Sequence, residues 1–335
     1  MFTSSFKNFL RGLAVFAVLV IVFETMVSLI PDEIGADVVL LGGMKIKNER
    51  ALNPGDLDVV ILGDCFFFGG VNPNVLDPIL NVRSFNFAVT RAHSYMMSFV
   101  LLEDILSRAK RPPRLIILGV HATSLYHPLT MDIDVLRETI LPFSGVSSNL
   151  LNELSVPLKM QTLWHDALTR IPSIRKQYLL RGHWPYLMTH FDRARYMRIK
   201  QSLAENRGYF NEDLLGFRQT LRVNFNLPAE DTTIRAYNDR YIRKILARAA
   251  KSGIKVVLVT NSYRKDLAEH LNYNIMFDVS YFETLKNSYP GVIGILDMHH
   301  VVSDPERYVD TTHLDNKGAA IFTSELAERI RQLDW

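Results

Sequence analysis

The chain has 335 residues, of which 48% are hydrophobic, and its formal net charge is +3 at pH 7. Its length and composition allow one large hydrophobic core. A charge balance so close to neutral gives no indication of a nucleic-acid partner, and none is expected. Cys65 is the only cysteine, which excludes an intrachain disulfide.

The N-terminal segment differs from the rest of the chain. From Phe9 to Ile30 it is almost wholly apolar, with Lys7 and Arg11 at its start. About twenty apolar residues span a bilayer, and flanking positive charge stays on the cytoplasmic side. A cleaved signal peptide is the alternative, but the apolar stretch is long for one and no small-x-small cleavage site follows closely. We therefore expect residues 1–31 to be an uncleaved single-pass anchor in the cytoplasmic (inner) membrane. The N-terminus would lie inside, and the main domain would be periplasmic or extracellular.

Two side chains gain significance from this location. Glu24 lies near the outer end of the apolar segment, where a carboxylate in lipid is costly. It either reaches the membrane interface or meets a membrane partner. Cys65 would be a free thiol in an oxidising compartment, which is a hazard unless the thiol is buried or used.

Downstream, a predicted linker over residues 32–57 leads into strands alternating with helices. The predicted strands are Val59–Leu62, Val82–Val89, Arg114–Val120, Ile254–Thr260 and Val292–Leu296. The predicted helices are a short one after the turn residues at Val71, then Ser94–Lys110, Thr232–Lys251, Lys265–Asn274, Tyr281–Ser288 and Lys317–Gln332. This alternation is typical of crossover units and predicts a mainly parallel sheet in an α/β fold.

The alternation of predicted strands and helices stops between about residues 125 and 230. This stretch is rich in Leu, His, Tyr, Trp and Arg and has no clear strand. We interpret it as a mainly helical insertion within a single domain over residues 58–335. It either covers one end of the sheet or forms a lid over substrate.

A nucleophile and a base are predicted near opposite ends of the chain. Cys65 directly follows the first strand and a Gly-Asp turn, and His313 follows Asp310 by three residues at the start of the last helix. In a parallel sheet, ligands gather at the carboxyl ends of the strands, where both segments should meet. A thiol activated by a histidine, which a carboxylate orients, is the arrangement of nucleophilic catalysis.

Four ordered segments resemble the SGNH (GDSL) hydrolase superfamily. They are Val60-Ile-Leu-Gly-Asp-Cys65, Phe85-Asn-Phe-Ala-Val89, Leu115-Ile-Ile-Leu-Gly-Val120 and Asp310-Thr-Thr-His313-Leu-Asp-Asn-Lys-Gly318. The similarity is closest to the membrane-anchored branch that includes alginate O-acetylation proteins and the protein that transfers D-alanine to teichoic acid. It covers the chain from about residue 55 to the C-terminus, apart from the insertion.

The resemblance implies a three-layer α/β/α sandwich and acyl-ester chemistry without a cofactor. It assigns Cys65 as nucleophile, His313 as base and Asp310 as the orienting partner. The family nucleophile is serine, so cysteine is a departure here. In the oxyanion hole, Arg91 stands in place of the family's glycine. No asparagine follows the third strand, where His121 or Thr123 would donate instead.

Two functional hypotheses follow. The first is a membrane-anchored extracytoplasmic acyltransferase or esterase acting on acyl, mainly acetyl, groups of a cell-surface or exported polysaccharide. By resemblance, its partner would be a multi-spanning membrane O-acyltransferase that supplies acyl groups. The alternative is a catalytically silent domain that binds the polysaccharide or that membrane partner. A soluble-substrate thioesterase or lipase is a third, weaker interpretation.

Several residues also have a structural interpretation. Cys65 could be a buried small residue, and Phe66-Phe-Phe68 is expected to be core packing more than an acyl pocket. We expect Asp64 to support the turn through backbone N–H groups, beside a possible role at the substrate, and Asn86 to be a structural hydrogen-bonder. His299 and His300 are adjacent and point to opposite faces of an extended chain, so no metal site is predicted.

Overall fold

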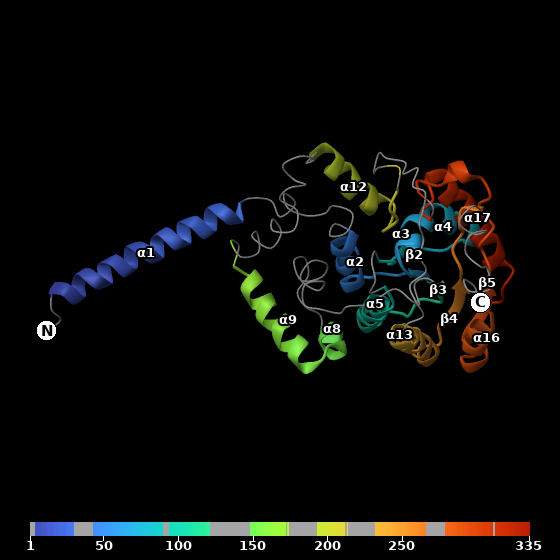
Figure 1. Ribbon diagram of the computed structural model, residues 1–335, viewed down its shortest axis with the longest axis horizontal. Helices are drawn as coiled ribbons and strands as arrows, with labels where there is room; N and C mark the ends of the chain where they lie inside the picture. The colour runs from blue at the N-terminus through green and yellow to red at the C-terminus, as the bar shows by residue number, and fades with distance from the viewer. Residues whose placement is uncertain are drawn as a thin grey trace.

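Five parallel strands organise the molecule. The computed structural model describes residues 4–29, 43–89, 94–120, 148–171, 173, 193–211, 213, 232–265, 279–310 and 312–335. In this part of the chain, the strands form a single sheet with the order β2-β1-β3-β4-β5, and every neighbouring pair is parallel (Figure 1). The prediction of an α/β fold with a parallel sheet is therefore confirmed.

The strands are short and mostly buried. They are β1 (Val59–Leu62), β2 (Ser84–Asn86), β3 (Leu115–Gly119), β4 (Lys255–Val259) and β5 (Val292–Leu296). Runs of Val, Ile and Leu suit strands covered on both faces. Parallel pairing brings the carboxyl ends of all five strands to one rim of the sheet.

The helices surround this sheet and extend beyond it (Figure 1). In the first half of the chain they are α1 (Ser4–Ser28), α2 (Gly43–Leu52), α3 (Cys65–Gly70), α4 (Pro73–Leu80) and α5 (Ser94–Arg108). Then come α8 (Ser148–Glu153), α9 (Val156–Thr169), α12 (Arg193–Glu205), α13 (Thr232–Lys251), α16 (Val279–Ser288), the 3-10 turn η4 (Pro305–Arg307) and α17 (Asn316–Arg331).

Two separate hydrophobic clusters use alternate residues of the strands. Val60 and Leu62 belong to a cluster with residues of α5, α13 and α16. Val59 and Ile61 belong to the other cluster, with residues of α3, α4 and α17. Because successive strand side chains point to opposite faces, β1 contributes to both clusters.

Most predicted elements have the expected bounds, and two differ. The strand predicted over Val82–Val89 has only the three residues of β2, and Asn81 before it ends α4 in a left-handed conformation with φ 54°. Beyond Asn86 the chain still bonds to β1 and the residue after it, through the Phe87 N–H to the Ile61 carbonyl at 2.8 Å and the Val89 N–H to the Gly63 carbonyl at 3.0 Å. The stretch predicted to be a linker contains α2, whose Lys47 and Ala51 are buried. The helix predicted at Lys265–Asn274 lies outside the described residues after Lys265.

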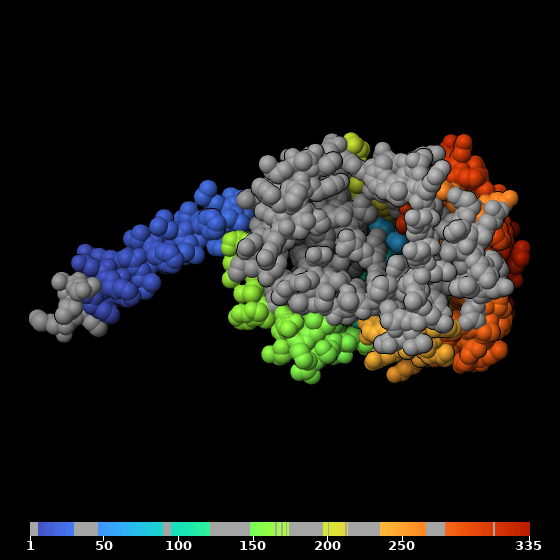
Figure 2. All heavy atoms as spheres, in the orientation of Figure 1, coloured from blue at the N-terminus to red at the C-terminus, as the bar shows by residue number. Residues whose placement is uncertain are grey.

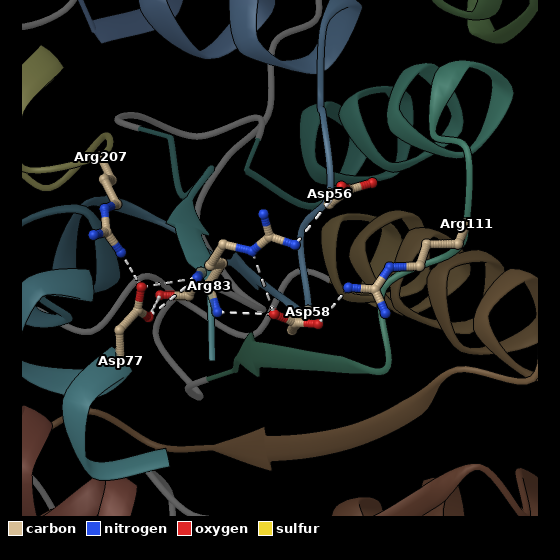
Figure 3. Close-up of polar contacts among 7 residues, drawn as sticks. Asp56, Asp58, Asp77, Arg83, Arg111 and Arg207 are labelled. Carbon is tan, nitrogen blue, oxygen red and sulfur yellow. Dashed lines mark hydrogen bonds and ion pairs between the residues drawn. The ribbon is translucent and has the colours of Figure 1, made fainter. Parts of the chain in front are cut away.

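A set of ion pairs and hydrogen bonds fastens the amino ends of β1 and β2 (Figure 3). Asp58, just before β1, accepts from Arg111 at 2.9 Å and from the backbone N–H of Arg83, just before β2, at 3.0 Å. Buried Asp77 of α4 pairs with Arg207 and accepts from the Ser84 N–H at 3.0 Å. These contacts join the segments that precede β1 and β2 to each other and to α4.

The described part of the predicted insertion is helical and is joined to the sheet edge. After α12, the backbone N–H of Asn86 donates to the Arg207 carbonyl at 2.9 Å, and the N–H of Phe210 donates to the Phe68 carbonyl at 3.1 Å. The rings of Phe68 and Phe210 stack with centroids 5.4 Å apart. Gly208 has φ +83°, and a Cβ there would lie 2.2 Å from the Asn86 carbonyl oxygen. The segment is thus part of the wall around α3.

Helix α1 extends away from the rest of the molecule (Figures 1 and 2). Its segment Phe6–Ser28 is long and apolar enough to cross a membrane, and none of it is buried within the protein. A soluble core helix of this composition would be covered by other elements, so the exposure fits a membrane-spanning segment.

Candidate active site

Cys65 stands beyond the carboxyl end of β1, the strand between β2 and β3. β1 ends at Leu62, and Gly63 turns the chain with φ +148°, a value that favours glycine. Asp64 caps α3, its Oδ1 accepting from the Phe66 N–H at 3.1 Å, which confirms its predicted structural role. Cys65 is the first residue of that helix and is half-buried, so its thiol is neither sealed in the core nor fully exposed.

Helix α3 is fixed in place by its surroundings. The side-chain amide of Asn86 donates to the carbonyls of Phe67 at 2.7 Å and Val71 at 2.8 Å, while its oxygen accepts from the Ala88 N–H at 3.0 Å. Asn86 is a structural hydrogen-bonder, as predicted. The Phe67 ring lies against Gly119 of β3, where a Cβ would come within 2.3 Å of a ring carbon. Only glycine at that position allows this approach.

His313 reaches the same rim from the C-terminal side. Tyr308 and Leu314 form an isolated antiparallel bridge around its loop, and the Val309 N–H donates to the His313 carbonyl at 2.9 Å. Asp315 then caps α17 through a 2.6 Å bond from the Gly318 N–H. These bonds hold the histidine at the entrance of the last helix.

Asp310 holds the imidazole and its own loop together. Its Oδ2 lies 2.8 Å from Nδ1 of His313, and its Oδ1 accepts the backbone N–H groups of Thr312 and His313, both at 2.7 Å. Because Nδ1–H donates to this carboxylate, Nε2 is left for the other side of the ring. Burial disfavours the charged carboxylate, but His313 and the backbone donors outweigh it and hold the pKa of Asp310 well below its usual value.

The side chains of Cys65 and His313 lie close enough to hydrogen-bond and to influence each other's charge. Burial alone would lower the pKa of the imidazole. The negative charge of a Cys65 thiolate, together with the hydrogen bonds to Asp310 and Cys65, instead raises the pKa of His313 well above its usual value. A cationic imidazole in turn favours the thiolate. The structure therefore brings together all three residues of the predicted triad, in the order thiol, imidazole, carboxylate.

Aromatic rings around the imidazole extend this arrangement. Phe66 stacks on His313 with centroids 5.2 Å apart and an interplanar angle of 18°. Tyr263, four residues beyond β4, meets Phe66 edge-on at 6.2 Å and stacks on His299 at 5.4 Å. Buried His299 in turn lies 2.7 Å from Asp297 through Nδ1. Phe66 was predicted to pack in the core, but its stacking on His313 was not predicted.

Lys47 is a second residue that sequence reasoning missed. It is 1% exposed, its ammonium lies 3.9 Å from the Phe68 ring centroid, and it donates to the Ala88 carbonyl. Among the described residues, no carboxylate pairs with it, and burial lowers the pKa of its amine well below the usual value. Lys47 thus ties α2 to the exit of β2. The sequence did not indicate this role, because Lys47 lies in a polar segment that was predicted to be a linker.

Of the remaining predicted site residues, the structure describes only Asp64. Arg91, His121 and Thr123, predicted around the oxyanion, fall outside the described residues. Asp64 directs a carboxylate oxygen at its own helix. Within the described ranges, no group of three or more His, Cys, Asp or Glu side chains could hold a metal ion. The arrangement that remains is a thiol, a base and an orienting carboxylate on a half-open rim, which is suited to nucleophilic chemistry.

No protein-family model matches this chain, and no curated protein matches it either. Functional interpretation therefore depends on the site itself.

Proposed function

We propose that this protein is a membrane-anchored, extracytoplasmic acyltransferase or esterase that acts on acyl groups, mainly acetyl, of a cell-surface or exported polysaccharide. The series Cys65, His313 and Asp310 at the carboxyl rim carries the proposal. The strand order, the clusters on alternate strand residues and the apolar α1 also fit a three-layer α/β/α sandwich of the SGNH type with an anchor.

In the proposed first step, the Cys65 thiolate attacks the carbonyl carbon of an acyl donor. The tetrahedral intermediate collapses to a thioester, and the leaving oxygen takes a proton from Nε2 of His313. Asp310 keeps the other ring nitrogen protonated and oriented. Backbone N–H groups of Cys65 and Arg91 hold the developing oxyanion.

In the second step, His313 removes the proton from a sugar hydroxyl as that oxygen attacks the thioester. The acyl group passes to the sugar and the thiolate is restored. Water in place of the sugar gives hydrolysis. A multi-spanning membrane O-acyltransferase is the proposed source of acyl groups.

The test is to incubate full-length protein with an activated acetyl ester and locate the acetyl group by peptide mass spectrometry. Acetyl on Cys65, lost in Cys65→Ala and strongly reduced in His313→Gln, supports the proposal. Cys65→Ser tests the rest of the machinery, because an intact base and oxyanion hole should also activate a hydroxyl. No adduct on the wild type and no esterase activity in Cys65→Ser would leave a binding role as the better account.

A further inference from the structure

One face of α9 is apolar and exposed. Val156, Met160, Leu163 and Trp164 recur at helical spacing, and Ile171 continues the row just beyond the helix. Each of these five side chains is between 40% and 73% exposed. On the opposite face, Thr162 is fully buried and Leu158 packs against the core. We call the five exposed residues the apolar row.

Helix α9 is tied to the outer end of α1. Ser173, just after the apolar row, donates through its N–H to one carboxylate oxygen of Glu24 at 2.9 Å and through its hydroxyl to the other at 2.5 Å. The carboxylate of Glu24, which would be costly in lipid, therefore has hydrogen-bond partners within the chain.

The position of Glu24 along α1 determines where the contact with Ser173 would lie relative to the bilayer. Phe6–Ser28 has 23 residues, which at 1.5 Å per residue is about 35 Å, slightly longer than the ~30 Å hydrocarbon layer. Glu24 is one turn from the end of that segment, so it lies at the boundary between hydrocarbon and headgroups when α1 spans the membrane. The end of α9 must lie at the same level.

The orientation of α9 matches this position. Figure 1 shows α9 at the side of the domain from which α1 departs, running across the direction of α1, and Figure 2 shows its atoms at the surface beside α1. A helix lying in the plane of the interface presents one apolar face to the lipid, commonly with tryptophan at headgroup level. Trp164 belongs to that face, and Arg170, the C-cap of the helix, pairs with Asp166 at 3.1 Å and remains exposed to the headgroup region.

We infer that α9 is an interfacial helix whose apolar row is buried in the surface of the bilayer that α1 spans. This inference rests on the anchoring part of the proposed function. It adds a second membrane contact, which fixes the orientation of the domain on the membrane. The carboxyl rim with Cys65 is then held at a defined height and does not rotate freely on a single tether.

The experiment uses the full chain in nanodiscs of phosphatidylethanolamine and phosphatidylglycerol, in a Cys65→Ser background without other cysteines. Single cysteines replace Met160 and Trp164 in the row, Gln161 on a flank of α9, Lys286 on α16 and Val18 in α1. Each receives a nitroxide, and its collision with oxygen, which concentrates in lipid, is compared with collision with a water-soluble nickel chelate.

We expect the oxygen-to-nickel ratio at 160 and 164 to exceed that at 161 and 286 several-fold and to approach the ratio at 18. If the oxygen-to-nickel ratios of the labels at positions 160 and 164 equal that at position 286 while the label at position 18 reports lipid, α1 is an anchor but α9 is not an interfacial helix. If 160 and 164 are shielded from both reagents, a protein surface such as a second copy covers the row, which also overturns the inference. A water-exposed label at 18 removes the anchor itself, and acetylation of Cys65 remains a separate measurement of the chemistry.

Discussion

The imidazole of His313 is constrained from three directions. Asp310 bonds Nδ1 at 2.8 Å, the Phe66 ring stacks on one face with centroids 5.2 Å apart, and the Cys65 side chain lies within interaction distance. Rotation of the ring would break at least one of these contacts. A base held in this way needs little reorganisation when a proton moves, which is the benefit of preorganisation.

The raised pKa of His313 predicts an unusual pH dependence for thiol alkylation. Below that pKa the imidazole is charged and favours the thiolate, so reaction of Cys65 with iodoacetamide should persist into the acid range. In His313→Gln the thiol should behave like a free cysteine, with a rate at pH 6 about 300-fold below its alkaline plateau. Alkylation rates from pH 5 to 10 measure this. Identical profiles for both proteins would show that the imidazole does not influence the thiol.

Lys47 predicts a second pH effect, on stability. Because burial lowers the folded-state pKa of Lys47, the unfolded chain binds a proton that the folded chain does not, between that lowered value and the ordinary one. The free energy of unfolding should therefore rise with pH in this window, by up to about 1.4 kcal/mol per unit. Lys47→Met should remove this slope and stabilise the protein near pH 7. Urea unfolding at several pH values, with the exposed Lys286→Met as control, measures the difference.

At the scale of elements, the short helix α3 is positioned by its neighbours. Its length of six residues gives it little intrinsic stability. Asn86 from β2 bonds two of its carbonyls, Phe322 of α17 meets Phe67 edge-on at 6.2 Å, and Gly119 of β3 leaves room for the Phe67 ring. The position of the thiol is thus set by three elements outside its own helix.

Gly119→Ala should displace α3. The added methyl group would overlap the Phe67 ring, and relief of such overpacking typically costs about 1–3 kcal/mol. Because Phe67 lies two residues after Cys65, acetylation of the thiol should slow as well. Gly70→Ala is the matched control. Gly70 lies in α3, the helix of Phe67, and a Cβ there would meet no neighbouring atom within 4 Å. Thermal unfolding and adduct formation measure both effects, and equal behaviour of the two variants would contradict the prediction.

Some of this arrangement was predictable from sequence, because simple rules govern it. Apolar runs bounded by turn residues placed β1 at Val59–Leu62, and parallel pairing predicted that its exit and the loop of His313 share a rim. The contacts of Lys47 and the stacking of Phe66 on His313 were not predictable. A buried lysine in a polar segment has no periodic signal, and ring contacts between residues far apart in the chain depend on tertiary packing.

At the scale of the molecule, a long apolar helix is attached to a domain with buried cores. The coarse prediction of a segment able to span a membrane is confirmed by α1, and the side of the membrane occupied by the domain stays a prediction. Lys7 and Arg11 precede or open the apolar segment, and only their charge favours the cytoplasm for the N-terminus.

Orientation can be measured with a reporter after Trp335. Alkaline phosphatase fused there should be active, because it folds only outside the cytoplasm, while green fluorescent protein at the same place should stay dark. Replacing Lys7 and Arg11 by Glu should weaken this preference, with Lys286→Glu as a control for a charge change far from α1. If the green fluorescent protein fusion is fluorescent and the phosphatase fusion is inactive, the domain lies in the cytoplasm and the proposed location is refuted.

The backbone bonds between the segment after α12 and the wall of α3 limit how this protein can be altered. Arg207 and Phe210 hold the edge of β2 and the end of the nucleophile's helix through main-chain hydrogen bonds, which no side-chain substitution removes. Excising residues 125–230 would therefore expose an unsatisfied strand edge. By the same connection, any displacement of the segment after α12 would be transmitted to α3, the helix that carries the thiol.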